Sequence, residues 1–118
     1  MAELQNIIEK ILAFRDERNW KQFHTPRNLA AALAIEAGEL QEVMLWKTDA
    51  EVENLLNSTE GKKSISAEIA DVLIYGLLLC DAMAIDPVVA ITEKLIENGL
   101  KYPADLARNN AAKYTKLK

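Results

Sequence analysis

Two pairs of acidic residues, each set within an apolar helical segment, constrain this chain more than any other feature. Glu36 and Glu39 form the first pair, and Glu68 and Asp71 form the second. A spacing of three residues on an α-helix places both side chains on one face, with Cβ atoms about 5–6 Å apart. If the two helices pack together, the carboxylates meet in a surface that the neighbouring Leu, Ile and Val residues would bury.

Burying unpaired charge in such a surface carries a large free-energy cost. A buried ionised carboxylate needs a counter-ion, a proton or a metal. The plainer alternative is that the acids lie on solvated helix faces, where Glu residues three apart are common. Two pairs flanked by apolar residues favour a site. Carboxylate oxygens select a hard cation, Mg²⁺ or Mn²⁺ as a substitute, and Mg²⁺ commonly accompanies bound phosphates. The sequence therefore predicts a magnesium site for phosphate chemistry.

Composition limits the class of protein. With 118 residues the chain is expected to form a single domain over residues 1–118, in which a tail from about 109 to 118 is expected to be flexible. Half of the residues are hydrophobic, with four Gly and three Pro, which suits a compact helical domain and indicates surface buried between subunits. The net charge of −4 disfavours a nucleic-acid partner.

The cysteine count and the apolar runs of the sequence indicate the cellular compartment. A single cysteine, Cys80, excludes an intramolecular disulfide and zinc-type cysteine spacing. The sequence has no signal-peptide pattern, and its longest apolar run is too short to span a bilayer. We expect a soluble cytoplasmic protein without a membrane partner.

Apolar residues recurring at three and four positions predict an all-α fold. Helices are expected over about 2–19, 26–47, 49–57, 64–84 and 87–99, with a short helix near 104–108. Thr25 and Asp86 each precede a proline, and Thr48 begins a capping box, which are typical helix starts. Residues 58–63 are predicted to be the main loop, a hinge or lid, with Ser64 or Ser66 capping the next helix and Gly99 ending the last long one.

Four residues suggest how a base could be bound. Trp46 and Tyr75 offer flat faces for stacking, worth about 1–3 kcal/mol per base, and Tyr75 shares a helix face with Asp71. His24 or Asn98 could hydrogen-bond a base edge. Each also has a structural alternative: Trp46 as helix packing, Asn98 as a helix-end residue, and His24 as an ordinary loop residue.

The ordered motifs of the chain are similar to those of the MazG-type all-α nucleoside triphosphate pyrophosphohydrolases, whose signature is ExxE followed later by ExxD. More narrowly they resemble the dCTP pyrophosphatase branch. The matching segments are Phe23–Leu29, Glu36–Leu40, Trp46–Lys47, Glu68–Tyr75 and Lys101–Arg108. The similarity extends from about residue 19 to the C-terminus, although the junction at Asn19 and Trp20 matches less clearly.

The resemblance implies a four-helix core, a homo-oligomer that is a tetramer or a dimer, and hydrolysis of a (d)NTP, with dCTP or a related deoxynucleotide expected, in dNTP-pool cleansing. The implied magnesium ligands are Glu36, Glu39, Glu68 and Asp71. The residues implied to surround the base and sugar are His24, Trp46, Tyr75 and Asn98. Those implied near the phosphates are Lys101 and Tyr102. A base contact from Trp20 is not supported by the resemblance.

The expected chemistry is direct attack of water on the α-phosphorus, because no Ser, Cys or His is placed as a nucleophile. Magnesium would neutralise the leaving pyrophosphate, and Glu36 or Glu39 would orient or deprotonate the water. The alternative function is a non-catalytic nucleotide-binding or oligomeric helical scaffold. A ferritin-like metal bundle is less consistent, since that architecture uses Glu-x-x-His pairs and the single His lies outside both acidic pairs.

Overall fold

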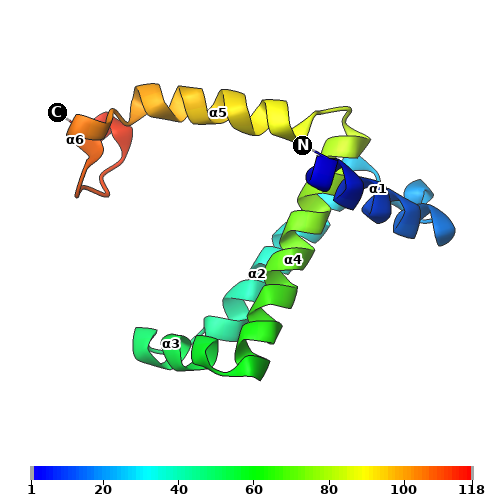
Figure 1. Cartoon of the computed structure of the whole chain (residues 1–118), viewed down its shortest axis with the longest axis horizontal. Coiled ribbons are helices and arrows are strands. Elements are labelled where there is room, and N and C mark those ends of the chain that lie inside the picture. The colour runs from blue at the N-terminus through cyan, green and yellow to red at the C-terminus, as the bar shows by residue number, and fades with distance from the viewer. Residues whose placement is uncertain (1, 118) are drawn as a thin grey trace. The chain divides into compact units, whose positions relative to one another are not determined.

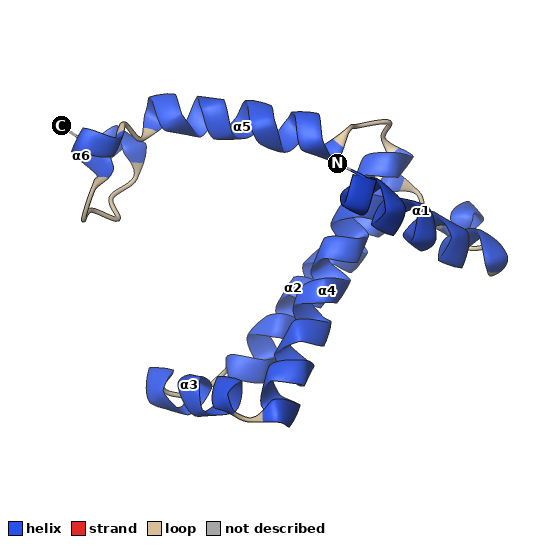
Figure 2. Cartoon of the chain, in the orientation of Figure 1, coloured by secondary structure: helices blue, strands red, loops and turns tan. Residues whose placement is uncertain are grey.

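The computed structural model describes residues 2–117, and this part of the chain contains helices, turns and loops but no strand (Figure 2). The predicted all-α fold is therefore confirmed. The elements are α1 (Ala2–Glu17), η1 (Lys21–Phe23), α2 (Pro26–Met44), α3 (Asp49–Asn57), α4 (Thr59–Ala82), α5 (Pro87–Lys101), α6 (Ala104–Ala107) and η2 (Tyr114–Lys116), where η denotes a 3₁₀ helix. No single helix among residues 2–117 is both long and apolar enough to cross a bilayer, although α4 and α5 taken together with the break between them would qualify.

The predicted helix starts are confirmed by their caps. The Thr25 hydroxyl accepts the backbone N–H of Asn28 at 3.2 Å, and Thr48 and Glu51 form the reciprocal capping box. The Asp86 carboxylate accepts two backbone N–H groups of the first turn of α5. These bonds satisfy N–H groups that have no partner inside their own helix.

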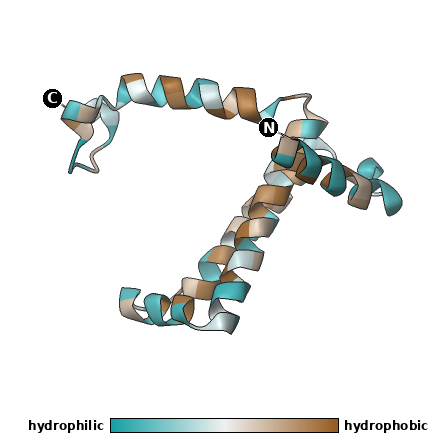
Figure 3. Ribbon diagram, viewed as in Figure 1, coloured by the Kyte–Doolittle hydropathy of each residue, from teal (hydrophilic) through white to brown (hydrophobic). Residues whose placement is uncertain are grey.

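The chain divides into two compact units, Met1–Ala84 and Ile85–Lys118. In the first unit, α2 and α4 lie side by side and antiparallel, and α3 packs near the start of α4 (Figure 1). Apolar residues run along both long helices (Figure 3). The buried core residues are Leu29 of α2 with Ile65 and Leu78 of α4. The α2–α4 contact is therefore the core of this unit, and both acidic pairs lie on these two helices.

The prediction of a main loop at residues 58–63 is wrong, because α4 begins at Thr59. Ser58 ends α3 and caps α4, and its hydroxyl accepts the backbone N–H of Gly61 at 3.0 Å. Gly61 is buried, and a Cβ there would overlap the carbonyl oxygen of Leu55 and the Ser58 side chain. The glycine thus allows a tight α3–α4 junction rather than a flexible lid, and neither Ser64 nor Ser66 is a cap.

The second unit contains α5, α6 and η2. Helix α5 continues to Lys101, so the prediction that Gly99 ends it is wrong; nothing crowds Gly99 and Tyr102 follows the helix as its cap. No residue between 85 and 117 is buried. The exposed apolar side chains of α5 are Val88, Val89, Ile91, Leu95, Ile96 and Leu100. The tail contacts the helix end, since the rings of Tyr114 and Tyr102 lie edge to face at 6.0 Å.

Candidate metal centre and adjoining pocket

Three of the four predicted metal-ligating acids come together in the first unit. One carboxylate oxygen from each of Glu36, Glu39 and Glu68 lies within 4.8 Å of the others. Glu36 and Glu68 are half-buried, whereas Glu39 is exposed. The helical spacing places Glu36 and Glu39 on one face of α2, and the antiparallel packing brings Glu68 of α4 against them.

Asp71 lies outside that group of three but close enough to act on it. Burial raises the pKa of Glu36, and a hydrogen bond with Glu39 together with the negative charges of Glu39, Asp71 and Glu68 raises it further. Like charges at close range disfavour ionisation. Every charged group that contributes to this pKa shift is acidic. These groups therefore do not neutralise the negative charge of the cluster.

The donor set fits a divalent cation. One buried carboxylate oxygen of Glu36 and one of Glu68 have no hydrogen-bond partner, which is costly unless another ligand satisfies them. Mg²⁺ binds oxygen at about 2.0–2.1 Å, so two oxygens on one ion lie at most about 4.2 Å apart. The observed separations are within 4.8 Å, which is close to that limit. The all-oxygen chemistry and the unpartnered oxygens agree with magnesium.

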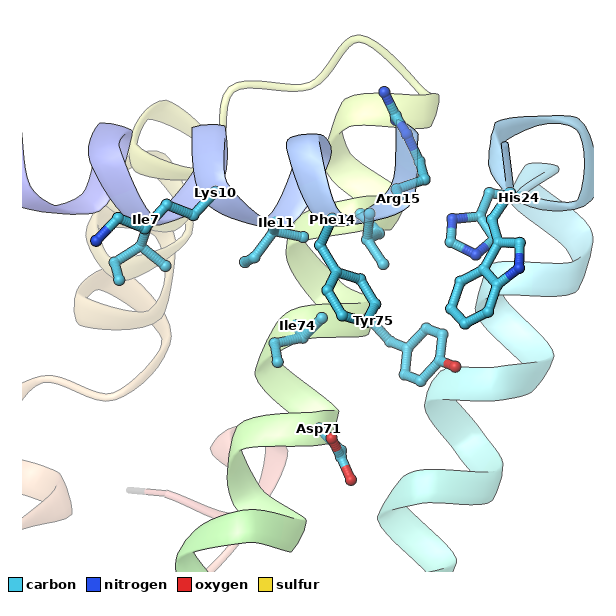
Figure 4. A pocket seen from close by; sticks show the side chains of 11 residues that line it. Ile7, Lys10, Ile11, Phe14, Arg15, His24, Asp71, Ile74 and Tyr75 are labelled. Atoms are coloured by element: carbon cyan, nitrogen blue, oxygen red, sulfur yellow. The ribbon is translucent and has the colours of Figure 1, made fainter. Parts of the chain in front are cut away.

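A cavity of about 460 Å³ adjoins this cluster and is lined by α1, α4 and the two residues that flank η1 (Figure 4). Its size is typical of small-ligand sites. The lining is mostly apolar, and its members are Ile7, Lys10, Ile11, Phe14, Arg15, Trp20, His24, Asp71, Ile74, Tyr75 and Leu78. Asp71 lies at one edge and Tyr75 one turn further along α4, so one acid of the predicted metal site is also a wall residue of the pocket.

Aromatic rings form one wall of the cavity. Trp20 lies 5.8 Å from Phe14 in an edge-to-face arrangement and 6.4 Å from the His24 ring. Burial lowers the pKa of His24, and the positive charge of Arg15 lowers it further. Both effects favour the neutral imidazole, and its buried Nδ1 has no hydrogen-bond partner. This histidine has one unused polar atom inside a pocket wall.

The structure brings His24 and Tyr75 together in the pocket but not Trp46. Trp46 follows α2, has a φ of 65° and is 92% exposed. Trp20, for which the resemblance did not support a base contact, lies in the wall instead. The available signal was its proximity to Phe23 and His24 in one aromatic-rich junction.

Asn98, Lys101 and Tyr102 belong to the second unit. The Asn98 carbonyl accepts the Tyr102 N–H at 2.8 Å, and the Lys101 ammonium pairs with Glu97 at 3.1 Å. Lys101 also lies 5.0 Å from the Tyr114 ring centre. Their predicted contacts with a nucleotide stay predictions.

Comparison with known proteins identifies the family. A family model described as MazG-like matches residues 31–117. This chain belongs to the MazG-like family. It is 41% identical over 114 residues to dCTP pyrophosphatase 1 of Homo sapiens and 40% identical to that of Rattus norvegicus, in each case over 97% of this chain and 67% of the relative.

A solved relative has the same fold. The crystal structure of a pyrophosphatase from Archaeoglobus fulgidus superposes with a TM-score of 0.78 at 39% identity, covering 86% of this chain and 93% of that one. The predicted MazG-like resemblance is thus confirmed, and so is the predicted enzyme class, a hydrolase of the pyrophosphatase type.

Proposed function

We propose that this MazG-like chain is a Mg²⁺-dependent nucleoside triphosphate pyrophosphohydrolase. It converts a (d)NTP, with dCTP or a related deoxynucleotide as the main substrate, to the monophosphate and pyrophosphate, and so cleanses or balances the cytoplasmic nucleotide pool. The observation that carries the proposal is that Asp71, whose charge acts on Glu36 of the acid cluster, also lines the aromatic pocket. A nucleotide would use both parts, since its flat base stacks on aromatic rings and its anionic phosphates need the divalent cation that the acid cluster would hold.

The nucleoside would occupy the pocket beside Trp20, His24 and Tyr75. Stacking on an aromatic face is worth about 1–3 kcal/mol per base. His24 would present its unused Nδ1 to a donor on the base or sugar. The phosphates would then pass Asp71 toward the acid cluster. The other proposed contacts are Trp46 and Asn98 around the nucleoside and Lys101 and Tyr102 near the phosphates.

The four carboxylates would hold magnesium, which supplies charge neutralisation of the phosphates when bound. The ligands proposed for this role are Glu36, Glu39, Glu68 and Asp71. Glu36 or Glu39 also orients the attacking water and accepts its proton; Glu39 is exposed and therefore open to solvent. The residues on α2 and α4 are rigidly positioned by the helix pair, which favours a fixed geometry for in-line attack.

We further propose that the two units act as one domain of a homo-oligomer, a tetramer or a dimer. The MazG-like match spans both units, which supports a single domain. The exposed apolar residues of α5 support a subunit interface, because contiguous exposed apolar surface usually marks a contact site. Nucleic acid and membrane are not proposed as partners.

The test is pyrophosphate release from a panel of common and modified (d)NTPs, with and without Mg²⁺. We expect Mg²⁺-dependent release with the highest kcat/KM for dCTP or a close relative. Glu39→Gln should lower kcat by about 100-fold or more, because general-base and electrostatic contributions are of that size. Trp20→Ala should raise KM by about 5- to 150-fold, the range that corresponds to one lost stacking contact.

Glu42→Gln is the matched control, since Glu42 is an exposed acid on the same helix outside the cluster. It should leave both kinetic constants within about twofold of the original values. Release without a divalent ion, or a Glu39→Gln variant at full rate, would contradict the mechanism. Nucleotide binding with no release from any substrate would favour the scaffold function.

A further inference from the structure

Helix α1 is attached to the end of α4 by one buried arginine. Nη1 of Arg15 lies 2.9 Å from Oδ2 of Asp81, and its Nε lies 2.8 Å from Oδ1 of Asp16. Arg15 is 6% exposed, the one buried residue of α1 and the one buried charged residue among residues 2–117. Arginine is almost never buried unless it is paired. Of the two carboxylates that pair with it, only Asp81 belongs to another helix, so the Asp81 contact is the one that joins α1 to α4.

The rest of α1 contributes the pocket wall but little buried surface. Ile7, Ile11 and Phe14 line the cavity, yet Ile7 and Phe14 are about half exposed. Figure 4 shows Phe14 and Ile11 pointing toward Ile74 and Tyr75, while the Arg15 guanidinium points away from Asp71. Arg15 is thus a lining residue whose guanidinium extends away from the acid cluster toward the end of α4.

Arg15 also anchors the turn that carries Trp20. Its carbonyl oxygen accepts the Trp20 N–H at 3.1 Å and the Arg18 N–H at 3.2 Å. Because both bonds join the main chain of Arg15 to the following turn, any displacement of α1 would also move the Trp20 ring. By docking α1, the Arg15 side chain therefore positions both the α1 residues of the wall and Trp20.

Asp81 occupies an unfavourable position for its own helix. It lies in the last turn of α4, where a negative charge opposes the helix dipole. Replacing it with Ala would remove that opposition and would not weaken the helix itself. Any stabilisation by Asp81 therefore comes from its contact with Arg15, which is 66 residues away in sequence.

We propose that Arg15 and Asp81 form a positioning pair that docks α1 as a wall of the nucleoside pocket and so sets substrate affinity. The inference rests on the proposed function. The carboxylates proposed to bind metal lie on α2 and α4, outside α1, so undocking of α1 leaves the metal site and the chemical step intact. Affinity falls in proportion to the docked fraction, and saturating substrate restores docking.

The experiment compares Asp81→Ala with Asp16→Ala in the full chain. Both remove one carboxylate from Arg15, but only Asp81 joins α1 to α4. If the docked fraction falls to about one tenth, Asp81→Ala raises KM about tenfold while kcat stays within about twofold. Asp16→Ala leaves both constants nearly unchanged. Asp81→Glu, which keeps the charge, restores KM most of the way to the value of the original protein.

An irreversible loss of folded protein would lower apparent kcat without raising KM, and reversible global unfolding would speed exchange throughout the chain, so the constants and the location of faster exchange together separate positioning from stability. Hydrogen exchange of the α1 amides gives a second readout that needs no activity. We expect faster exchange over residues 2–17 in Asp81→Ala and not in Asp16→Ala. Equal KM and equal exchange in the two variants would overturn the proposal.

Two further results are also decisive. Faster α1 exchange with unchanged KM would overturn the positioning role and leave only a structural tether. If the panel showed no hydrolysis, the proposed function would fail, and the exchange measurement would still decide whether Asp81 docks α1. Should Asp81→Ala fail to fold, Asp81→Asn, which keeps the side-chain volume and one acceptor oxygen, gives the same comparison.

Discussion

At the residue scale, the acid cluster combines partial burial with repulsion between like charges. Glu36 has its pKa raised first by burial and then by Glu39, Asp71 and Glu68. The folded metal-free protein therefore binds a proton at Glu36 more tightly than the unfolded chain does. A divalent cation would reverse this preference, because its charge favours the ionised carboxylate.

This shift predicts a pH effect on the metal-free protein. Since the folded pKa lies above the unfolded one, ionisation of Glu36 lowers the free energy of unfolding as pH rises from the ordinary carboxyl range through the raised pKa. The destabilisation is absent below the unfolded pKa. Glu36→Gln should therefore raise stability at neutral pH in chelator and flatten this part of the profile.

The measurement is thermal unfolding in chelator from about pH 4 to 8, the range that spans ordinary and raised carboxyl pKa values. Glu42→Gln, outside the cluster, should follow the original protein. Added Mg²⁺ should stabilise the original protein more than Glu36→Gln, because a ligand stabilises the state that binds it. Superimposable profiles for the original protein and Glu36→Gln would contradict the assigned cause.

At the scale of elements, the α3–α4 junction shows how one residue sets the distance between two helices. Ser58 serves both helices, as the C-cap of α3 and the N-cap of α4. Gly61 then passes close to the Leu55 carbonyl, where no other side chain fits. The junction places the start of α4 beside the end of α3 and so sets the direction in which Glu68 and Asp71 are presented.

Gly61→Ala should destabilise the protein by about 1–3 kcal/mol, the usual cost of forcing extra volume into a packed site. This reverses the ordinary helical preference, in which Ala is favoured over Gly by up to about 1 kcal/mol. Gly99→Ala is the matched control in α5, because no neighbouring atom lies within 4 Å of the position that its added Cβ would take. Denaturant unfolding followed by circular dichroism gives both values, and a stabilised Gly61→Ala variant would refute the steric explanation.

At the scale of the whole molecule, the second unit lacks what an independent domain needs. No residue from 85 to 117 is buried, and the unit is shorter than the roughly 40 residues below which domains seldom fold without added support. Helix α5 keeps its large apolar residues on one side and Ala90, Glu93, Lys94 and Glu97 on the other. The proposed homo-oligomer would cover the apolar side.

Sedimentation velocity tests this proposal directly. The original chain should sediment as a dimer or tetramer at micromolar concentration. Leu95→Glu should shift it toward smaller species, since a charge on a desolvated apolar face is strongly unfavourable. Ala90→Glu adds the same charge on the polar side of α5 and should leave the assembly unchanged. A monomeric original chain, or equal effects of the two variants, would contradict the assigned interface.

Local sequence determined the all-helical class, the N-caps Thr25, Thr48 and Asp86, and the candidate metal ligands. Thr25, Thr48 and Asp86 bond backbone groups within three residues of themselves, and the acidic pairs follow from helical periodicity. Such signals are complete within one or two turns of helix. For the same reason, the all-α class and the facing carboxylates of Glu36 and Glu39 could be predicted before any packing was known.

Tertiary structure alone decided the pocket wall and the junctions. Trp20 rather than Trp46 lines the cavity, and Gly61 allows two helices to pack closely rather than forming a loop. Arg15 pairs with Asp81, which is 66 residues away in sequence. Each outcome depends on which side chains meet after α1, α3 and α4 have packed. Pairwise contacts between distant residues leave no periodic signal in a single sequence, whereas a helix and its caps are specified by neighbours.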